Sequence, residues 1–197
     1  GSSSASECEP LTYTQQINGV AYTIHEFLAA ENCNFTFPDG ISQFDVYAVG
    51  GGGGGGNNVG GGGGGGGSAF LAGLSTSGNN KTLKITVGKG GAGGVNVNST
   101  LRHGQNGTAT LVRSSTSATI LTANPGSGGL TYGTTLQCGG TRDSRGGAGG
   151  AAGTGGSAGA TGGQGAGVGI ASTNGANGYS TNFTGTTRFF GGAGGGG

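Results

Sequence analysis

The sequence has no tryptophan and no methionine, and only 8% of its 197 residues are charged, with a formal net charge of +1. Such a near-neutral chain lacks the basic surface by which proteins bind nucleic acid. It also lacks an apolar run of about 18 residues that could cross a membrane. We therefore expect neither nucleic acid as a partner nor membrane insertion. The N-terminal Gly1–Ser4 carries no signal-peptide pattern and fits a mature end after cleavage or a cloning scar.

The sequence also lacks the residue patterns of an active site. His25 and His103 are far apart, and no HxxxH or CxxC spacing indicates a metal site. No two acidic residues have a spacing that indicates glycosidase chemistry. No glycine-rich stretch is followed by the Lys-Ser/Thr of a phosphate-binding loop. We expect a protein that is not an enzyme and that uses no metal and no cofactor.

Proline is scarce, with three residues and none after Pro125, which argues against a collagen triple helix. Glycine is abundant instead, with 55 residues, roughly four times average usage. A flexible linker is the usual interpretation of such a composition. Disordered chains, however, carry high net charge and few β-branched or aromatic residues. Here Val, Ile, Phe and Tyr gather in strand-like blocks, which favours an ordered protein.

The three cysteines are an odd number, which in an extracellular protein indicates one disulfide plus a free or intermolecular thiol. Cys8 and Cys33 flank the same strand-rich segment, so we favour a bridge between them, with Cys138 free or intermolecular. In the alternative, Cys138 bridges to one of these two cysteines.

Several segments predict β-strands. Leu11–Ile17 and Val20–Leu28 flank Asn18-Gly19, a strong hairpin signal. A second strand pair flanks the Pro38-Asp39-Gly40 turn. The remaining predicted strands are Asn34–Phe37, Ile41–Val49, Thr82–Val87, Thr108–Arg113, Ala118–Thr122, Leu130–Thr135 and Asn182–Phe190. The fold class is therefore mainly β, an antiparallel β sandwich or jelly-roll-like arrangement without α-helix.

The glycine runs Gly50–Gly56 and Gly60–Gly67 predict a different structure. Each glycine costs about 1 kcal/mol against alanine in a helix, and a glycine strand has no side chains to pack. The conformation that remains possible for ordered glycine runs is polyproline II, which is called polyglycine II in glycine chains. We expect Asn57-Asn58-Val59 to reverse the chain, so that two such helices lie side by side. Their backbone groups then need lateral partners in a bundle.

A spacing of three extends this prediction to other segments. Three residues per turn place every third residue on one edge of a polyglycine II helix. We expect these glycines to face the bundle and the small residues between Gly147 and Gly162 to face outward. The regularly spaced glycines are Gly88, Gly91 and Gly94, then Gly147, Gly150, Gly153, Gly156, Gly159, Gly162 and Gly165, then Gly191, Gly194 and Gly197; the small residues are Ala148, Ala151, Ala152, Thr154, Ser157, Ala158, Ala160 and Thr161.

We interpret the chain as an extended polar leader, residues 1–10, followed by one domain, residues 11–197. The glycine segments cannot be stable without the strands, so we treat residues 11–197 as one domain. Along the chain it comprises strands at 11–49, polyglycine at 50–67, strands and loops at 82–135, a glycine-rich part at 139–180, and a final strand and glycine tail at 182–197.

Three segments together carry a family resemblance. They are Phe35–Ile41, Val46–Val49 running into the glycines, and Thr86–Gly94. This pattern resembles the glycine-rich domains of bacterial surface proteins and phage tail-fibre proteins, over roughly residues 25–197. The resemblance implies a non-enzymatic module of β-strands and polyglycine II helices used in surface display, adhesion or host recognition, with no catalytic residue. The leader and the first hairpin lie outside it.

The sequence suggests three alternative functions, and each of them places the protein outside the cell or on the cell surface. In the first, the chain is a homopolymer subunit of a filament, pilus or sheath, assembled by strand donation from residues 1–16, with Leu11, Tyr13 and Ile17 as candidate assembly residues. In the second, it is an adhesin tip that recognises a surface glycan or protein through loops. The candidate recognition residues are Tyr132, Arg142, Asn174, Asn177 and Tyr179. In the third, a flat face over Ala148–Thr161 binds ice, an arrangement that resembles springtail antifreeze proteins.

Overall fold

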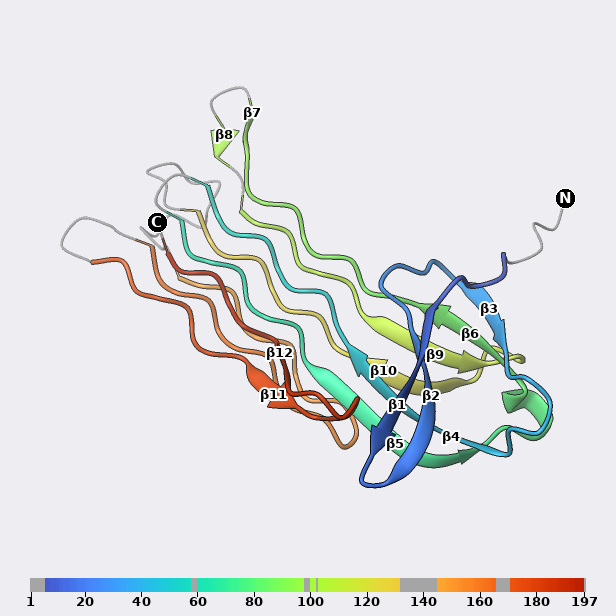
Figure 1. The fold of residues 1–197 in the computed structure, drawn as a ribbon. Coiled ribbons are helices and arrows are strands. Elements are labelled where there is room, and N and C mark those ends of the chain that lie inside the picture. Colours follow the sequence, from blue (N-terminus) through green and yellow to red (C-terminus); the bar gives the residue numbers. More distant parts are fainter. Residues whose placement is uncertain are drawn as a thin grey trace, which may run out of the picture.

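The computed structural model describes residues 6–57, 60–97, 100–101, 103–131, 145–165 and 171–196. Figure 1 shows two parts, a body of β-strands and a set of wavy, extended glycine-rich segments that run side by side away from it. We call these parts the β body and the glycine rod. The first strands of the chain belong to the β body, and the last described residues run along the glycine rod.

The β body is built around a four-stranded antiparallel sheet of order β10-β9-β6-β3. Its strands are β3 (Cys33–Thr36), β6 (Thr82–Thr86), β9 (Thr110–Ser114) and β10 (Thr119–Ala123). Strands β4 (Gln43–Val49) and β5 (Ser68–Ser75) form a separate antiparallel pair. These elements supply one hydrophobic core, which consists of Cys33, Phe37, Ala48, Ala69, Leu83, Ile85, Val112, Leu121 and Ala123. The predicted mainly β, antiparallel fold class is thus confirmed.

The N-terminal hairpin forms as predicted. Strands β1 (Leu11–Ile17) and β2 (Val20–Glu26) pair over seven residues each without a register shift. Asn18 and Gly19 have φ values of 51° and 81°. This positive φ at both central residues is what the Asn-Gly dipeptide favours.

The other elements are short. They are a 3₁₀-helix η1 (Gly78–Asn80) and the strand pairs β7 (Asn96–Val97) with β8 (Thr100–Leu101), and β11 (Tyr179–Thr181) with β12 (Arg188–Phe190). The part of the chain that the structure describes contains no α-helix.

The prediction that strands flanking the Pro38 turn pair with each other is wrong. The turn forms, with Gly40 at φ 87°, but β3 pairs with β6 and β4 pairs with β5. Strand β5, which the sequence did not predict, follows the glycine runs directly. The chain therefore leaves the body after β4, travels out and back along the rod, and returns beside β4.

Two predicted strands at later positions also differ. The segment Asn182–Phe190 is not one strand but the turn and second strand of a hairpin, in which Gly185 has φ 77°. In the predicted strand Leu130–Thr135, Leu130 and Thr131 belong to no strand, and the rest lies outside the described residues.

The predicted disulfide Cys8–Cys33 is confirmed and joins residues 25 apart in sequence. It fixes the leader along strand β3. There the Cys8 amide donates to the Asn34 carbonyl at 2.7 Å, and the Asn34 amide donates to the Ser6 carbonyl at 2.9 Å. Cys138 lies outside the described residues.

Replacing both Cys8 and Cys33 by serine is expected to lower the free energy of unfolding by about 3 kcal/mol, because the bridge closes a loop of this length in the unfolded chain. Chemical denaturation of the wild type and the double variant under non-reducing conditions measures the difference. Equal stability of the two proteins contradicts the assignment.

Candidate functional site

The structural centre of the glycine rod is the pair of runs Gly50–Gly56 and Gly60–Gly67, which we call the central segments. They lie antiparallel and are joined by backbone hydrogen bonds at every third residue. The amides of Gly50, Gly53 and Gly56 donate to the carbonyls of Gly67, Gly64 and Gly61 at 2.9, 2.8 and 2.8 Å. The prediction that these two runs lie side by side is confirmed.

The central segments also bond to the segments around them, again with a step of three. Gly51 and Gly54 donate to Thr108 and Gln105. Gly61, Gly64 and Gly67 donate to Leu130, Ser127 and Asn124, and Gly62 and Gly65 donate to Gly163 and Ala160. In the other direction, amides of residues 91, 94, 126, 129, 147, 150 and 194 donate to central carbonyls. Lateral bonds of the main chain thus link the whole rod.

Glycine is required where these backbones meet. Residues Gly60 to Gly67 are all buried, and a Cβ built on Gly63 or Gly66 would overlap the carbonyl of Gly53 or Gly50. Other central positions are roomier. A Cβ on Gly55 would lie 3.8 Å from the Gly61 carbonyl oxygen, an ordinary van der Waals distance. The need for glycine therefore comes from close approach and differs from one position to the next.

The predicted spacing of three holds in the outer segments. A Cβ on Gly88, on Gly91, or on any of the six regularly spaced glycines from Gly147 to Gly162 would collide with a neighbour. The small residues between Gly147 and Gly162 are exposed as predicted, except Ala160, which is 8% exposed. The C-terminal series of glycines, which begins at Gly191, fits this prediction less well, because a Cβ on Gly194 would lie 3.6 Å from its nearest atom.

The structure describes three of the five predicted recognition residues. Asn174 and Asn177 are exposed along the rod, whereas Tyr132 and Arg142 lie outside the described residues. Tyr179 lies in strand β11 rather than in a loop. Its hydroxyl donates to the Gly66 carbonyl at 3.3 Å. Burial is the main reason that the pKa of Tyr179 rises to about 12; Tyr47 raises it further, and Ser68 opposes the rise.

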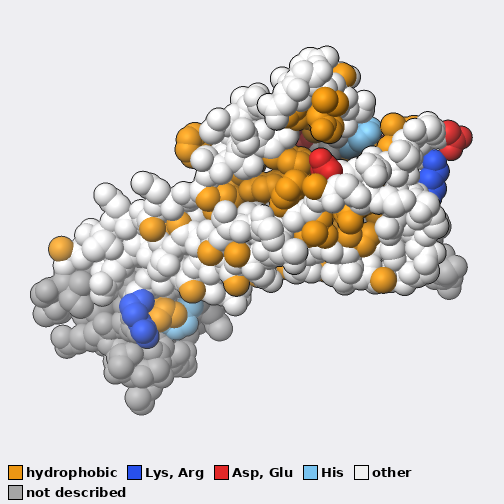
Figure 2. Space-filling model, turned by 90° about the horizontal axis from the view of Figure 1, so that it is seen from below, with side chains coloured by type: hydrophobic (Ala, Val, Ile, Leu, Met, Phe, Trp, Pro, Cys, Tyr) orange, Lys and Arg blue, Asp and Glu red, His pale blue; other side chains and the backbone are white. Residues whose placement is uncertain are grey.

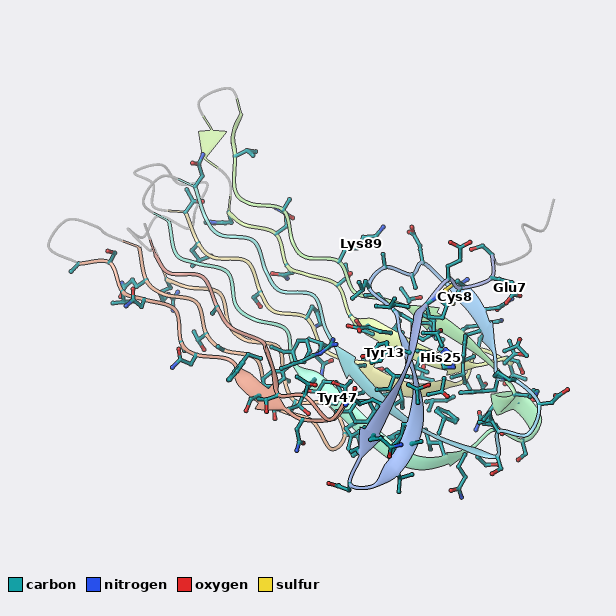
Figure 3. All side chains as sticks on the ribbon, in the orientation of Figure 1. Glu7, Cys8, Tyr13, His25, Tyr47 and Lys89 are labelled. Carbon is teal, nitrogen blue, oxygen red and sulfur yellow. A yellow bond between two sulfur atoms is a disulfide. The ribbon has the colours of Figure 1, made fainter. Side chains whose placement is uncertain are left out.

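The candidate assembly residues Leu11, Tyr13 and Ile17 lie in β1, where they pair with β2 of the same chain. Figure 3 shows Tyr13 on this hairpin. Its hydroxyl donates to Glu26 at 3.3 Å, and Arg188 of β12 donates both to the Glu26 carboxylate and, at 3.3 Å, to the Tyr13 hydroxyl. These bonds tie the N-terminal hairpin to the C-terminal one.

An aromatic cleft lies where the rod joins the β body. Tyr47, which Figure 3 labels, and Phe183 have stacked rings with centroids 5.5 Å apart, and Phe70 meets Phe183 edge to face at 5.5 Å. The cleft has a volume of about 260 Å³. Its other lining residues are Ser68, Gly155, Gly156, Ser157, Ser180, Thr181 and Asn182, so its described lining carries no charge.

The described residues contain neither a cluster of metal-binding side chains nor a helix that could cross a membrane. They hold no group of three His, Cys, Asp or Glu residues close enough to bind a metal ion. None of their helices is long and apolar enough to cross a membrane. Figure 2 shows apolar side chains gathered on the β body and only scattered along the rod.

Comparison with known families identifies the chain. The glycine-rich domain family matches residues 28–197, so the chain belongs to this family. No curated protein and no solved structure matches the chain. The family match begins at Leu28 and therefore excludes the leader and the β1–β2 hairpin.

Gly63→Ala is expected to lower the free energy of unfolding by about 3 kcal/mol or more, since the added methyl must displace backbone in a buried lattice. Gly55→Ala is the matched control from the same pair of segments and should change stability by less than about 1 kcal/mol. Denaturant unfolding of both variants tests this. Similar losses at the two positions contradict the lattice geometry.

Because the pKa of Tyr179 is about 12 in the folded protein, against about 10 for a free tyrosine, the folded state holds its proton more tightly. Its contribution to stability is complete below pH 10 and is lost as the pH rises toward 12. We expect Tyr179→Phe to lose less stability than the wild type over this pH range. Urea midpoints of both proteins at pH 8 and pH 11 measure the difference. An equal loss of stability in the wild type and in Tyr179→Phe contradicts this prediction.

Proposed function

We propose that this chain is a non-enzymatic structural protein of an extracellular assembly, such as a subunit of a filament, pilus or sheath. The observation that carries the proposal is the step of three in the lateral hydrogen bonds between glycine segments. A polyglycine II bundle has this step, because the helix turns once in three residues and bonds only to neighbours. The rod then serves as a stiff spacer held together by main chain.

The chemistry of the chain supports a location outside the cell. A disulfide closes the leader onto β3, and such bridges persist in oxidising compartments. Between Gly147 and Gly162 the outer residues of the rod are small and uncharged. This stretch offers proteases and charged ligands few side chains, which suits a spacer. Assembly of copies by strand pairing is the form of self-association that we favour.

This role is tested on material from the producing cell rather than on isolated chains alone. Electron microscopy of surface material, with detection of the chain by an antibody, should show it within regular polymers or sheaths. A chain that is found only as a monomer, both in the native material and in size-exclusion chromatography at high concentration, contradicts the proposal.

A second candidate, a glycan-binding adhesin or phage-type recognition module, is favoured by the aromatic cleft. Ligand sites in proteins are mostly lined by apolar and aromatic side chains with a few polar groups that fix orientation, and this lining combines aromatic rings with neutral polar groups. Glycan-array binding that is lost in Phe183→Ala supports this function. Ser172→Ala, an exposed change outside the cleft lining, is the control and should bind as the wild type does. Absence of any glycan signal for the wild type counts against it.

A further inference from the structure

The outer edge of strand β1 is open. In a hairpin with a two-residue turn, the residues flanking the turn form a hydrogen-bonded pair, here Ile17 and Val20. The alternate residues Thr12, Thr14 and Gln16 therefore direct their N–H and C=O groups away from β2. No described residue forms a backbone hydrogen bond with these outward groups. The edge thus presents a row of unpaired donors and acceptors.

Other edges in the β body are covered by the chain itself. Residues Ser6 and Cys8 bond along β3, where the disulfide holds them. Along β5, Ser68 and Phe70 donate to Ser157 and Thr154, each at 2.8 Å. These two strands cannot accept a further strand without losing native hydrogen bonds.

Further edges are interrupted by irregular pairing. The pairing of β4 with β5 shifts register between Phe44 and Val46, and that of β10 with β9 shifts between Thr119 and Leu121. Such bulges are a common protection against pairing with foreign strands, as are edge charges and prolines. Strand β1 has none of these protections. Its seven residues pair in continuous register, and none is charged or proline.

The opposite edge of the hairpin, along β2, has no described backbone partner either, but it carries a charged residue, Glu26, which forms an ion pair with Arg188. His25 of β2 packs on Phe35 of β3, with ring centroids 4.8 Å apart, which places one face of the hairpin against the β body.

The C-terminal hairpin contacts side chains of β1, through the bond from Arg188 to the Tyr13 hydroxyl. It comes near the outward backbone groups of β1 at Gln16, where a Cβ on Gly185 would lie 3.3 Å from the carbonyl oxygen. The outward backbone groups of Thr12 and Thr14 therefore form the accessible edge.

We propose that this edge pairs with the same edge of a second copy of the chain, antiparallel, with Thr12 opposite Thr14 of the second copy. The two hairpins then form one four-stranded sheet of order β2-β1-β1-β2. The inference deepens the proposed structural function and rests on it, because it names one surface that copies share. Such a two-fold contact closes at a dimer, so a polymer also needs a second contact between dimers.

The sequence of β1 suits pairing with itself. A two-fold axis places the same patch of each copy against the other. Here it sets threonine against threonine, a favourable cross-strand pair, and brings no like charges together. Leu11, which is 58% exposed, gains the side chains of the second copy as neighbours. A partner with a charged strand would find no complementary charge on β1.

The test is a matched pair of proline substitutions. Thr14 and Thr23 face each other in the register, both are exposed, and both direct their amides outward. Proline is tolerated at such edge positions because the lost N–H makes no bond within the hairpin. Thr14→Pro removes a donor from the β1 edge, and Thr23→Pro removes one from the β2 edge.

Sedimentation equilibrium of the full chain should show a reversible dimer for the wild type. We expect Thr14→Pro to raise the dimer Kd at least tenfold, and Thr23→Pro to leave it within about twofold. Thr14→Lys, which keeps the backbone donor but places a charge at the edge, should also weaken the dimer. It serves in place of Thr14→Pro if that variant does not fold.

A wild type that stays monomeric at every concentration overturns the inference, as does equal weakening by the two proline variants. The inference and the proposed function can fail separately. If native polymers exist and form unchanged from Thr14→Pro protein, the edge pairing is wrong and the structural role stands. If no native polymer contains the chain, the structural role is wrong.

Discussion

The structure depends on hydrogen bonds between glycine backbones in neighbouring segments. Fixing each residue costs about 1–2 kcal/mol of backbone entropy, and glycine is at the high end of this range. A single lateral hydrogen bond contributes only about 1 kcal/mol. One glycine helix therefore cannot be stable alone, and order requires that each segment bond to several others. The central segments meet this condition, since Gly61 and Gly62 donate to different neighbours while their carbonyls accept from others.

The β body contributes the hydrophobic core that the glycine rod lacks. Its core of leucine, isoleucine, valine and phenylalanine side chains gains the hydrophobic free energy that glycine lacks. Its strands also fix where the glycine segments begin, and so set the register of their hydrogen bonds. At one such junction, the Gly88 amide donates at 2.8 Å to the Thr110 hydroxyl, which in turn donates to the Val49 carbonyl. Two excursions into the rod, the one that begins after Val49 and the one between β6 and β9, are aligned through this one threonine.

Local signals in the sequence predicted much of this fold. The Asn18-Gly19 hairpin, most of the β-branched strands and the glycine spacing of three between Gly147 and Gly162 each reflect a short-range rule, and these were confirmed in the described residues. Strand partners were harder to predict. Strand β4 pairs with β5 across the whole polyglycine excursion, and no local pattern links the two. Strand β5 itself was missed because Ser68–Ser75 contains alanine and glycine beside its few large residues.

The candidate sites were predicted less well than the fold. Tyr179 looked like a loop residue because glycine and asparagine surround it, yet its position follows from a contact with Gly66, more than a hundred residues away. The aromatic cleft joins Tyr47, Phe70 and Phe183 from three separate segments. Only the folded chain brings such residues together. The open edge of β1, by contrast, could be foreseen from its uncharged, regular sequence once the pairing of the other edges was known.

Amide hydrogen exchange of the central segments tests the account most directly. If lateral hydrogen bonds order the rod, the amides of Gly61, Gly62, Gly64, Gly65 and Gly67 should exchange as slowly as those of the core strands β6 and β9, through global unfolding. Exchange of these glycines at the rate of an unstructured peptide, while β6 and β9 remain protected, would contradict it.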